Sequence, residues 1–174
     1  MKKLVLIRHA KSSWKHPDLL DIDRPLNKRG KRDAPFMGKR LKHMKIYPEL
    51  IMSSPARRAK KTAKMLASEL DYPRAKIRIQ PDIYHGDVMD MVSVIHEIDD
   101  DYQHVFLIGH NPYITELADF LTGSRIDNMP TCGFAGILFD LNRWKEIEEG
   151  KGRLEFFDYP KKHFLDPQKD SSLI

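Results

Sequence analysis

Near its N-terminus the chain reads Leu4-Val5-Leu6-Ile7-Arg8-His9-Ala10. Four consecutive apolar residues followed by polar ones are typical of a strand that is buried on both faces, as in a parallel sheet covered by helices. Arg8 and His9 come directly after the apolar run, at the carboxyl end of the predicted strand. This stretch therefore predicts an α/β fold in which two reactive side chains lie at one edge of the sheet.

The rest of the chain alternates between strand-like and helix-like segments. Apolar residues recur at helical spacing in 26–44, 59–70, 89–98 and 113–121. Further strands are predicted at 48–52, 76–80, 104–108, 134–141 and 153–157, with 76–80 nearer an edge of the sheet. The alternation predicts a three-layer α/β/α sandwich with a mainly parallel central sheet.

The ends of the predicted helices carry recognisable signals. Asn27 or a neighbour is expected to cap the first helix. The second helix is predicted to start with Ser54 as its cap and Pro55 at its first position. Gly123 is expected to end the helix that begins at Tyr113.

Ligands in open α/β sheets bind outside the carboxyl ends of the strands. That rule selects three loops, namely 8–10, 53–55 and 109–111. Two of them contain a histidine directly after an apolar strand, and the other leads within one helical turn to Arg57 and Arg58. Arginine holds phosphate oxygens in a bidentate fork, and neutral imidazole is a competent nucleophile near pH 7. The three loops therefore predict a site for an anion and a nucleophile.

The bulk composition limits the class of protein. The length of 174 residues predicts one domain, placed at 1–160, followed by a loose polar tail at 161–174. A net charge of +5 is spread along the chain, so nucleic acid is not expected as a partner. One cysteine, no signal-peptide core and no apolar run long enough to cross a membrane favour a cytoplasmic protein without membrane contact. Nothing indicates the oligomeric state.

Four segments together resemble one known family. Residues 4–14 resemble the Arg-His-Gly/Ala signature of the histidine phosphatase superfamily, and 53–63 resemble its Ser-Pro-x-x-Arg-Ala-x-x-Thr segment. Gly109-His110-Asn111-Pro112 is similar to its second-histidine segment. Residues 23–30 match an Arg-Pro-Leu-x-x-x-Gly helix start typical of the small SixA-like phosphohistidine phosphatase branch. The resemblance spans residues 4 to about 160 in the right order and implies a phosphoglycerate mutase-like fold.

The resemblance implies a role for each matching residue. His9 would be the nucleophile that is transiently phosphorylated, and Arg8 would hold phosphate oxygens. Arg58 rather than Arg57 matches the helix arginine, because it directly precedes Ala59. His110 would complete the clamp, and Ser12 is a candidate for contributing a hydroxyl. The resemblance implies neither a metal nor an organic cofactor, and it implies a phosphorylated protein or small phosphorylated molecule as substrate.

One departure from the family bears on the substrate. Larger relatives that cleave phosphoesters supply a carboxylic acid to protonate the leaving oxygen, and no clean match to that segment occurs here. Asp87 and His85 lie where the acid would be, but Asp87 is interpreted first as a turn residue after glycine. An enzyme without a strong acid should prefer a phosphoramidate such as phosphohistidine.

Other polar and aromatic residues receive structural interpretations. Arg57 is expected to be a solvated helix charge, and Arg24 to pair with Asp21 or Asp23. Cys132 is expected to be a packing residue. The aromatic residues Trp14 and Trp144 are expected over core edges, and five histidines at the surface, namely His16, His43, His96, His104 and His163.

Three other functions remain open at this point. A phosphomutase would use the same phosphoenzyme, although the chain lacks the insertions that cover the site in such enzymes. A non-catalytic module would use the pocket to hold a phosphorylated protein. Nucleic-acid binding would rest on the +5 charge alone.

Overall fold

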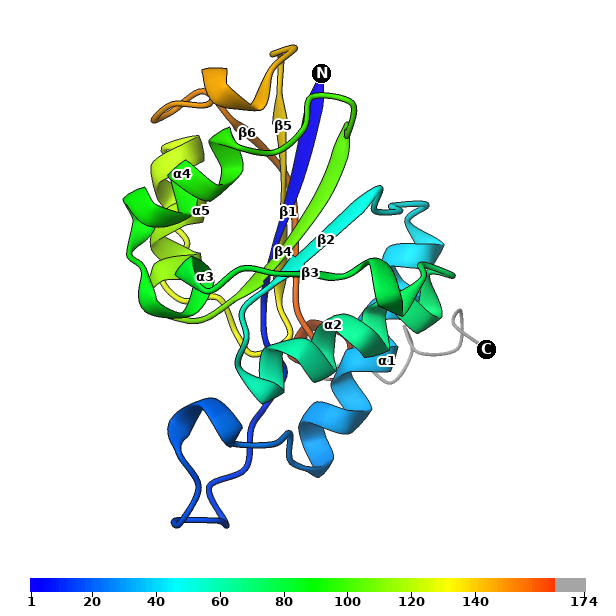
Figure 1. Ribbon diagram of the computed structural model, residues 1–174. Coiled ribbons are helices and arrows are strands. Elements are labelled where there is room, and N and C mark those ends of the chain that lie inside the picture. Colours follow the sequence, from blue (N-terminus) through cyan, green and yellow to red (C-terminus); the bar gives the residue numbers. More distant parts are fainter. Residues whose placement is uncertain (165–174) are drawn as a thin grey trace.

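A computed structural model describes residues 1–164 and contains one six-stranded sheet with the order β3-β2-β4-β1-β5-β6 (Figure 1). The strands are β1 (Lys2–Arg8), β2 (Leu50–Ser53), β3 (Arg78–Ile79), β4 (His104–Gly109), β5 (Phe134–Phe139) and β6 (Arg153–Asp158). The pairs β1–β4, β2–β4 and β2–β3 are parallel, whereas β1–β5 and β5–β6 are antiparallel. The predicted mainly parallel sheet is confirmed.

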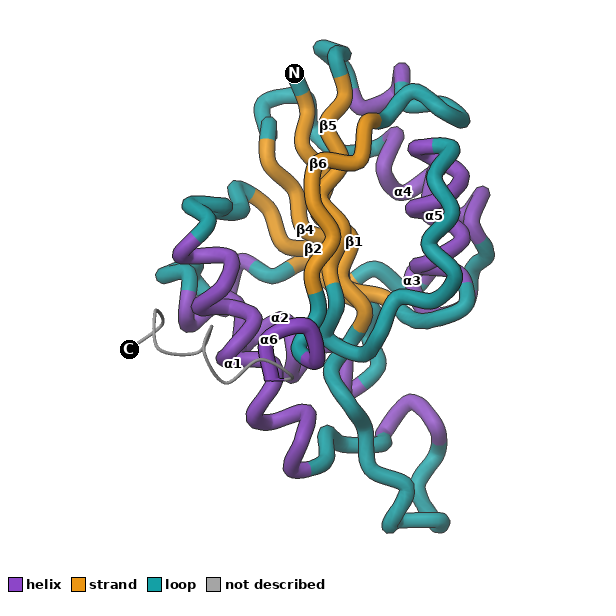
Figure 2. The backbone as a smooth tube through the Cα atoms, turned by 180° about the vertical axis from the view of Figure 1, so that it is seen from behind, coloured by secondary structure: helices purple, strands orange, loops and turns teal. Residues whose placement is uncertain are grey.

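Helices cover both faces of the sheet (Figures 1 and 2). On one face lie α1 (Lys28–His43) and α2 (Arg57–Glu69), and on the other lie α3 (Asp82–His85), α4 (Val88–His96) and α5 (Tyr113–Thr122). The α/β/α sandwich is therefore confirmed. Short 3-10 turns at η1 (Asp21–Asp23), η2 (Arg74–Lys76) and η3 (Trp144–Glu146), and the single-turn helices α3 and α6 (Lys161–Phe164), were not expected.

Strand β1 shows why the sequence requires two helical layers. Leu4 and Leu6 pack into the core beneath α4 and α5, while Val5 and Ile7 pack into the core beneath α1 and α2. All four are at most 1% exposed. Alternate side chains of a strand point to opposite faces, so an unbroken apolar run needs cover on both.

The register places the three predicted loops together. Arg8 pairs with Gly109 at the ends of β1 and β4, and Ser53 pairs with Ile108 at the end of β2. The amide of His9 then donates to Gly109 O at 3.1 Å. Because these parallel strands end side by side, the residues that follow them share one edge of the sheet.

The helix starts were predicted with mixed success. Asn27 caps α1, since its side chain accepts from the Gly30 amide at 2.9 Å. The prediction that Ser54 caps α2 was wrong, because the helix begins at Arg57 and its N-cap, Ala56, makes no side-chain cap bond. The Ser54 hydroxyl instead accepts from the Ala56 amide at 3.1 Å. Gly123 ends α5 in the left-handed conformation, with φ at 68°, as predicted.

The two tryptophans differ. Trp144 is fully buried in the core beneath α4 and α5. The expectation for Trp14 was wrong, since it is 73% exposed. Its ring lies under the Arg24 guanidinium at 3.3 Å from the ring centroid, and this stacking takes the place of core packing.

The structure describes only the first four residues, 161–164, of the segment that was expected to be a loose tail. Residues 161–164 form α6, and the Phe164 ring lies 4.8 Å from that of Phe36. The remainder of that segment, 165–174, lies outside the described residues. The domain boundary at residue 160 stays a prediction. None of the helices described between residues 1 and 164 has the length and hydropathy needed to cross a membrane.

Candidate active site

His9 lies just beyond β1 with 8% of its surface exposed. Its Nδ1 atom is 2.7 Å from the Ala10 carbonyl oxygen. Because a carbonyl only accepts, Nδ1 carries the ring proton and Nε2 keeps a free lone pair. Burial first, and then the nearby His110 and arginines, lower the pKa of His9 to about 3. The imidazole is therefore neutral at pH 7.

Arg58 joins the two histidines. It is the second residue of α2 and is 6% exposed. Its Nε group donates toward His9 Nε2 at 3.4 Å, and its Nη2 atom lies 3.4 Å from His110 Nδ1. One guanidinium thus faces both imidazoles, which is the placement needed to hold an anion beside Nε2 of His9.

His110 follows β4, and its ring centroid is 5.0 Å from that of His9. Since the Arg58 guanidinium only donates, His110 Nδ1 is the acceptor, and Nε2–H donates to Ser54 Oγ at 2.7 Å. Burial and then the charge of Arg58 lower the pKa of His110 to about 4. Arg58 therefore sets the tautomer of His110, and the Ser54 hydroxyl accepts from His110 instead of capping a helix.

Arg8 is the last residue of β1, and its Nη1 group donates to Met129 O at 2.9 Å. Its Nε atom is buried and has no hydrogen-bond partner among the described residues. The positive charge of Arg8 adds to the causes that lower the pKa values of His9 and His110. The structure thus brings His9, Arg58 and His110 into contact, with Arg8 directly before His9 at the end of β1, and the roles expected of the four residues stay predictions.

Ser12 is buried beside Arg24, and its expected contact with the phosphate stays a prediction. Its hydroxyl accepts a hydrogen bond from Arg24 Nη2, and its backbone forms an isolated bridge with Leu26. Arg24 also donates to Ser13 O and pairs with Asp21 at 3.0 Å, as one of the predicted ion pairs. In this arrangement the Ser12 hydroxyl anchors the segment 14–25, which we call the strap.

The strap carries Asp21, a carboxylate that the sequence analysis expected only as a possible partner of Arg24 and not at the site. Asp21 Oδ2 accepts from Arg58 Nη2 at 3.0 Å and from Tyr84 OH at 2.8 Å, and Asp21 O accepts from Arg58 Nη1 at 2.7 Å. Partial desolvation raises the pKa of Asp21, but hydrogen bonds from Tyr84, Arg24 and Arg58 hold it well below its usual range. Asp21 is therefore ionised, and it holds the Nη1 and Nη2 groups of Arg58 in place.

Asp87 is used for folding. It is the N-cap of α4, where its Oδ1 accepts from the Met89 and Asp90 amides at 2.9 and 3.1 Å. The Asp90 carboxylate accepts in return from the Asp87 amide, which completes a capping box. His85 is exposed at the end of α3. The structure therefore agrees with the interpretation preferred from the sequence, in which Asp87 is a structural residue after glycine.

Thr62 also was not singled out for a role from the sequence. Its Oγ1 accepts from the Ala10 amide at 3.0 Å and donates to Arg58 O at 2.8 Å. A single buried hydroxyl therefore ties the loop after His9 to the helix turn that carries Arg58. The spacing of Arg58 and Thr62, one helical turn apart, is the sequence signal that could have identified it.

The residues given structural interpretations mostly follow them. Arg57 is exposed, and Cys132 is fully buried beneath α1 and α2, where burial raises the pKa of its thiol. His16, His43 and His104 are exposed. The expectation of a surface position was wrong for His96 and His163, because both side chains are half-buried. The His96 ring bonds to Ile147 O, and the His163 ring bonds to the Asp158 carboxylate. Within residues 1–164 no group of three His, Cys, Asp or Glu residues is placed to hold a metal ion.

Fold and site together define a class of protein, an α/β/α protein with paired imidazoles and arginines at the carboxyl edge of its sheet. The sequence profile of the histidine phosphatase superfamily (branch 1) matches residues 4–107. An uncharacterized chloroplastic protein of Arabidopsis thaliana is 33% identical over 83% of this chain and 70% of its own.

Solved structures agree on the fold. The protein histidine phosphatase SixA complexed with tungstate superposes with a TM-score of 0.79 at 22% identity, covering 92% of this chain and 98% of that one. A SixA-type structure from Agrobacterium tumefaciens gives a TM-score of 0.77 at 25% identity, covering 91% and 98%. The chain belongs to the histidine phosphatase superfamily, its fold is similar to that of the SixA structures, and these findings support phosphatase activity.

Proposed function

We propose that this protein is a phosphohistidine phosphatase that works through a phosphoenzyme on His9. The observation that carries the proposal is the unprotonated Nε2 atom of His9, which lies 3.4 Å from the Nε group of Arg58. A neutral nucleophile beside fixed positive charge suits attack on a phosphoryl group, whose charge spreads over three oxygens. Arg8, Arg58 and His110 would hold those oxygens.

The reaction would proceed in two transfers. Nε2 of His9 forms a bond to phosphorus as the bond from phosphorus to the substrate's nitrogen breaks, and the electron pair stays on that nitrogen. Water then attacks the phosphorus, the bond to His9 breaks, and inorganic phosphate leaves. His110 Nδ1 would take up a proton when the dianion arrives, because the anion offsets the arginine charge that lowers its pKa.

The ionised state of the carboxylate at the site favours a phosphoramidate over a phosphoester as substrate. Among the described residues, Asp21 is the one carboxylate bonded to Arg58, and its lowered pKa keeps it ionised. An ionised carboxylate cannot protonate a leaving alkoxide, whereas the imidazole of a phosphohistidine leaves more easily. The substrate class that fits is therefore phosphohistidine.

The test is a substrate panel run with a chelator present. We expect hydrolysis of phosphohistidine at least 100-fold faster than of an alkyl phosphomonoester, with acid-labile label trapped on His9. His9→Ala should abolish both label and turnover, and the matched control His43→Ala, at an exposed position on α1, should keep them. Equal rates on both substrates would remove the phosphohistidine assignment. Activity that survives His9→Ala, or that is lost with chelator, would overturn the mechanism.

The panel also separates the other functions. Label passing from one substrate to another without release of phosphate would indicate a phosphomutase. Tight binding of phosphohistidine without turnover would indicate a binding module.

A further inference from the structure

A groove lined by positive charge lies beside the candidate site, between the strap, α1 and the N-terminal half of α2. It consists of two adjoining pockets of about 730 and 420 Å³ that share Pro25, Leu26, Lys31 and Arg57. We call it the basic groove. Its cationic side chains are Lys15, Lys28, Lys31, Arg57, Lys60, Lys61 and Lys64.

Four of these cations form a stripe along one helix. Arg57, Lys60, Lys61 and Lys64 occupy positions i, i+3, i+4 and i+7 of α2, which lie on one face of a helix. At a rise of 1.5 Å per residue the stripe is about 10 Å long. Lys28 and Lys31 of α1 line the groove as well. The charge is therefore concentrated on a surface of defined length.

The groove lacks internal compensation. None of its seven cations forms an ion pair with the described residues, whereas Arg29, Arg40 and Lys42 of α1 each do. Asp18 is the one carboxylate among the described residues that line it. Like charges three and four positions apart on a helix repel one another and destabilise it. An anionic partner would relieve this repulsion.

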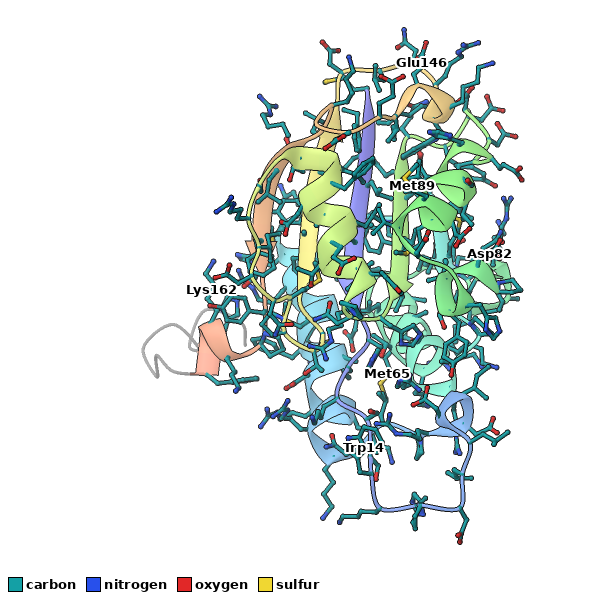
Figure 3. All side chains as sticks on the ribbon, turned by 90° about the vertical axis from the view of Figure 1, so that its left-hand side faces the viewer. Trp14, Met65, Asp82, Met89, Glu146 and Lys162 are labelled. Atoms are coloured by element: carbon teal, nitrogen blue, oxygen red, sulfur yellow. The ribbon has the colours of Figure 1, made fainter. Side chains whose placement is uncertain are left out.

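Acidic residues gather at the other end of the molecule. Figure 3 shows Glu146 at one end of the structure and Trp14, on the strap, at the other. The turns at the end near Glu146 also carry Asp99, Asp100, Asp101, Glu148 and Glu149, which outnumber the cations Arg143, Lys145 and Lys151 of the same segment. This separation would orient an approaching acidic partner with its charge toward the groove.

The groove and the candidate site share their structural elements. Arg57 lines the groove while its neighbour Arg58 reaches His9, and Lys15 of the strap lines the groove while Asp21 of the same strap holds Arg58. A partner seated in the groove therefore contacts the two elements that position the guanidinium.

We propose that the basic groove docks an acidic surface of a phosphoprotein substrate. The inference rests on the proposed function for its substrate and adds the chemistry of the partner. Protein is favoured over nucleic acid because the groove walls include Pro17, Leu19, Pro25 and Leu26, and the described lining residues include no Phe, Tyr or Trp on which a base could stack.

The experiment uses two phosphohistidine peptides of equal length, one flanked by six glutamates and one by six glutamines. The wild-type chain should process the acidic peptide with at least tenfold higher kcat/KM. The groove variant Lys31→Glu/Lys61→Glu/Lys64→Glu should lose this preference. The control Lys39→Glu/Lys145→Glu/Lys151→Glu changes three exposed lysines outside the groove, so it has the same net charge and should keep the preference.

Two further measurements keep the docking separate from the chemistry. Hydrolysis of free phosphoramidate should differ by less than threefold among the three proteins, and its absence in the wild type would refute the proposed function alone. Anisotropy of the unphosphorylated acidic peptide then still reports docking. Equal use of both peptides by the wild type, or equal loss in both variants, would overturn the groove proposal. Tighter binding of a 15-nucleotide RNA than of the acidic peptide, lost in the groove variant, would replace protein by nucleic acid.

Discussion

Arg58 directs its Nε group at the unprotonated Nε2 atom of His9 across 3.4 Å. The atom that would attack phosphorus and the group that would hold its oxygens are therefore adjacent before any substrate arrives. Such preorganisation removes the need to rearrange charge during the reaction.

Replacing Arg58 should therefore reduce turnover strongly. We expect Arg58→Ala to lower kcat about 10²- to 10³-fold, the effect typical of removing one charge-stabilising donor. Arg58→Lys should recover little, since lysine lacks the planar fork. Arg153→Ala, at an exposed position on β6, is the control. A tenfold or smaller loss in Arg58→Ala, measured by steady-state kinetics, would contradict the assignment.

Asp21 should oppose the binding of phosphate. Its carboxylate occupies Arg58 Nη2 at 3.0 Å and repels an arriving dianion. Asp21→Asn removes the charge but keeps the backbone contact to Arg58. We expect inorganic phosphate to inhibit this variant about five- to tenfold more tightly. Asp18→Asn, elsewhere on the strap, should leave the inhibition constant unchanged, and weaker inhibition of Asp21→Asn would show that Asp21 only positions Arg58.

The two site histidines should make stability depend on pH. In the folded protein the pKa of His9 is about 3 and that of His110 about 4, both below the ordinary 6.5. From about pH 6.5 down to these values, the unfolded chain therefore binds more protons than the folded protein. The free energy of unfolding should therefore fall as pH drops below 6.5, by up to about 2 kcal/mol per site at pH 5. His9→Gln and His110→Gln should each flatten the dependence in urea titrations, whereas His43→Gln should not. Parallel curves for all four proteins would show that the imidazoles ionise normally.

Gly30 should tolerate no side chain. A Cβ there would lie 2.2 Å from Lys11 O, in the segment that follows His9. Gly30→Ala must push α1 away from that segment, and we expect a loss of about 2–3 kcal/mol in urea unfolding. Gly109→Ala is the comparison, because its closest contact is a side-chain carbon of Ile83 at 3.2 Å, which can shift. Equal stability of the two variants would refute the packing argument.

The sheet and the four central side chains were predictable because their positions follow from local pattern. An apolar run buried on both faces fixes a parallel strand, and the carboxyl-end rule then places His9 and His110 at one edge. The choice of Arg58 over Arg57 came from the resemblance to the family, because Arg58 directly precedes Ala59.

Asp21 and Trp14 were placed wrongly or not at all because their positions depend on contacts distant in sequence. Asp21 is held by Arg58 and Tyr84, which are 37 and 63 residues away. Trp14 lies under Arg24 instead of over the core. Ser54 was misassigned because its hydroxyl serves His110, 56 residues away, in place of its own helix. Periodicity carries no information about such pairings.

Thr62 gives a test of positioning that is separate from charge. Its hydroxyl satisfies the Ala10 amide and bonds Arg58 O, and the residue is fully buried. Thr62→Val keeps the shape but leaves that amide unpaired, which should cost about 1–3 kcal/mol of unfolding free energy. We expect kcat to fall about tenfold with KM nearly unchanged, because the loop carrying His9 loses its link to α2. Thr62→Ser restores the hydroxyl and should recover most of kcat. If serine and valine variants lose equal activity, the methyl packing rather than the hydrogen bonds positions His9.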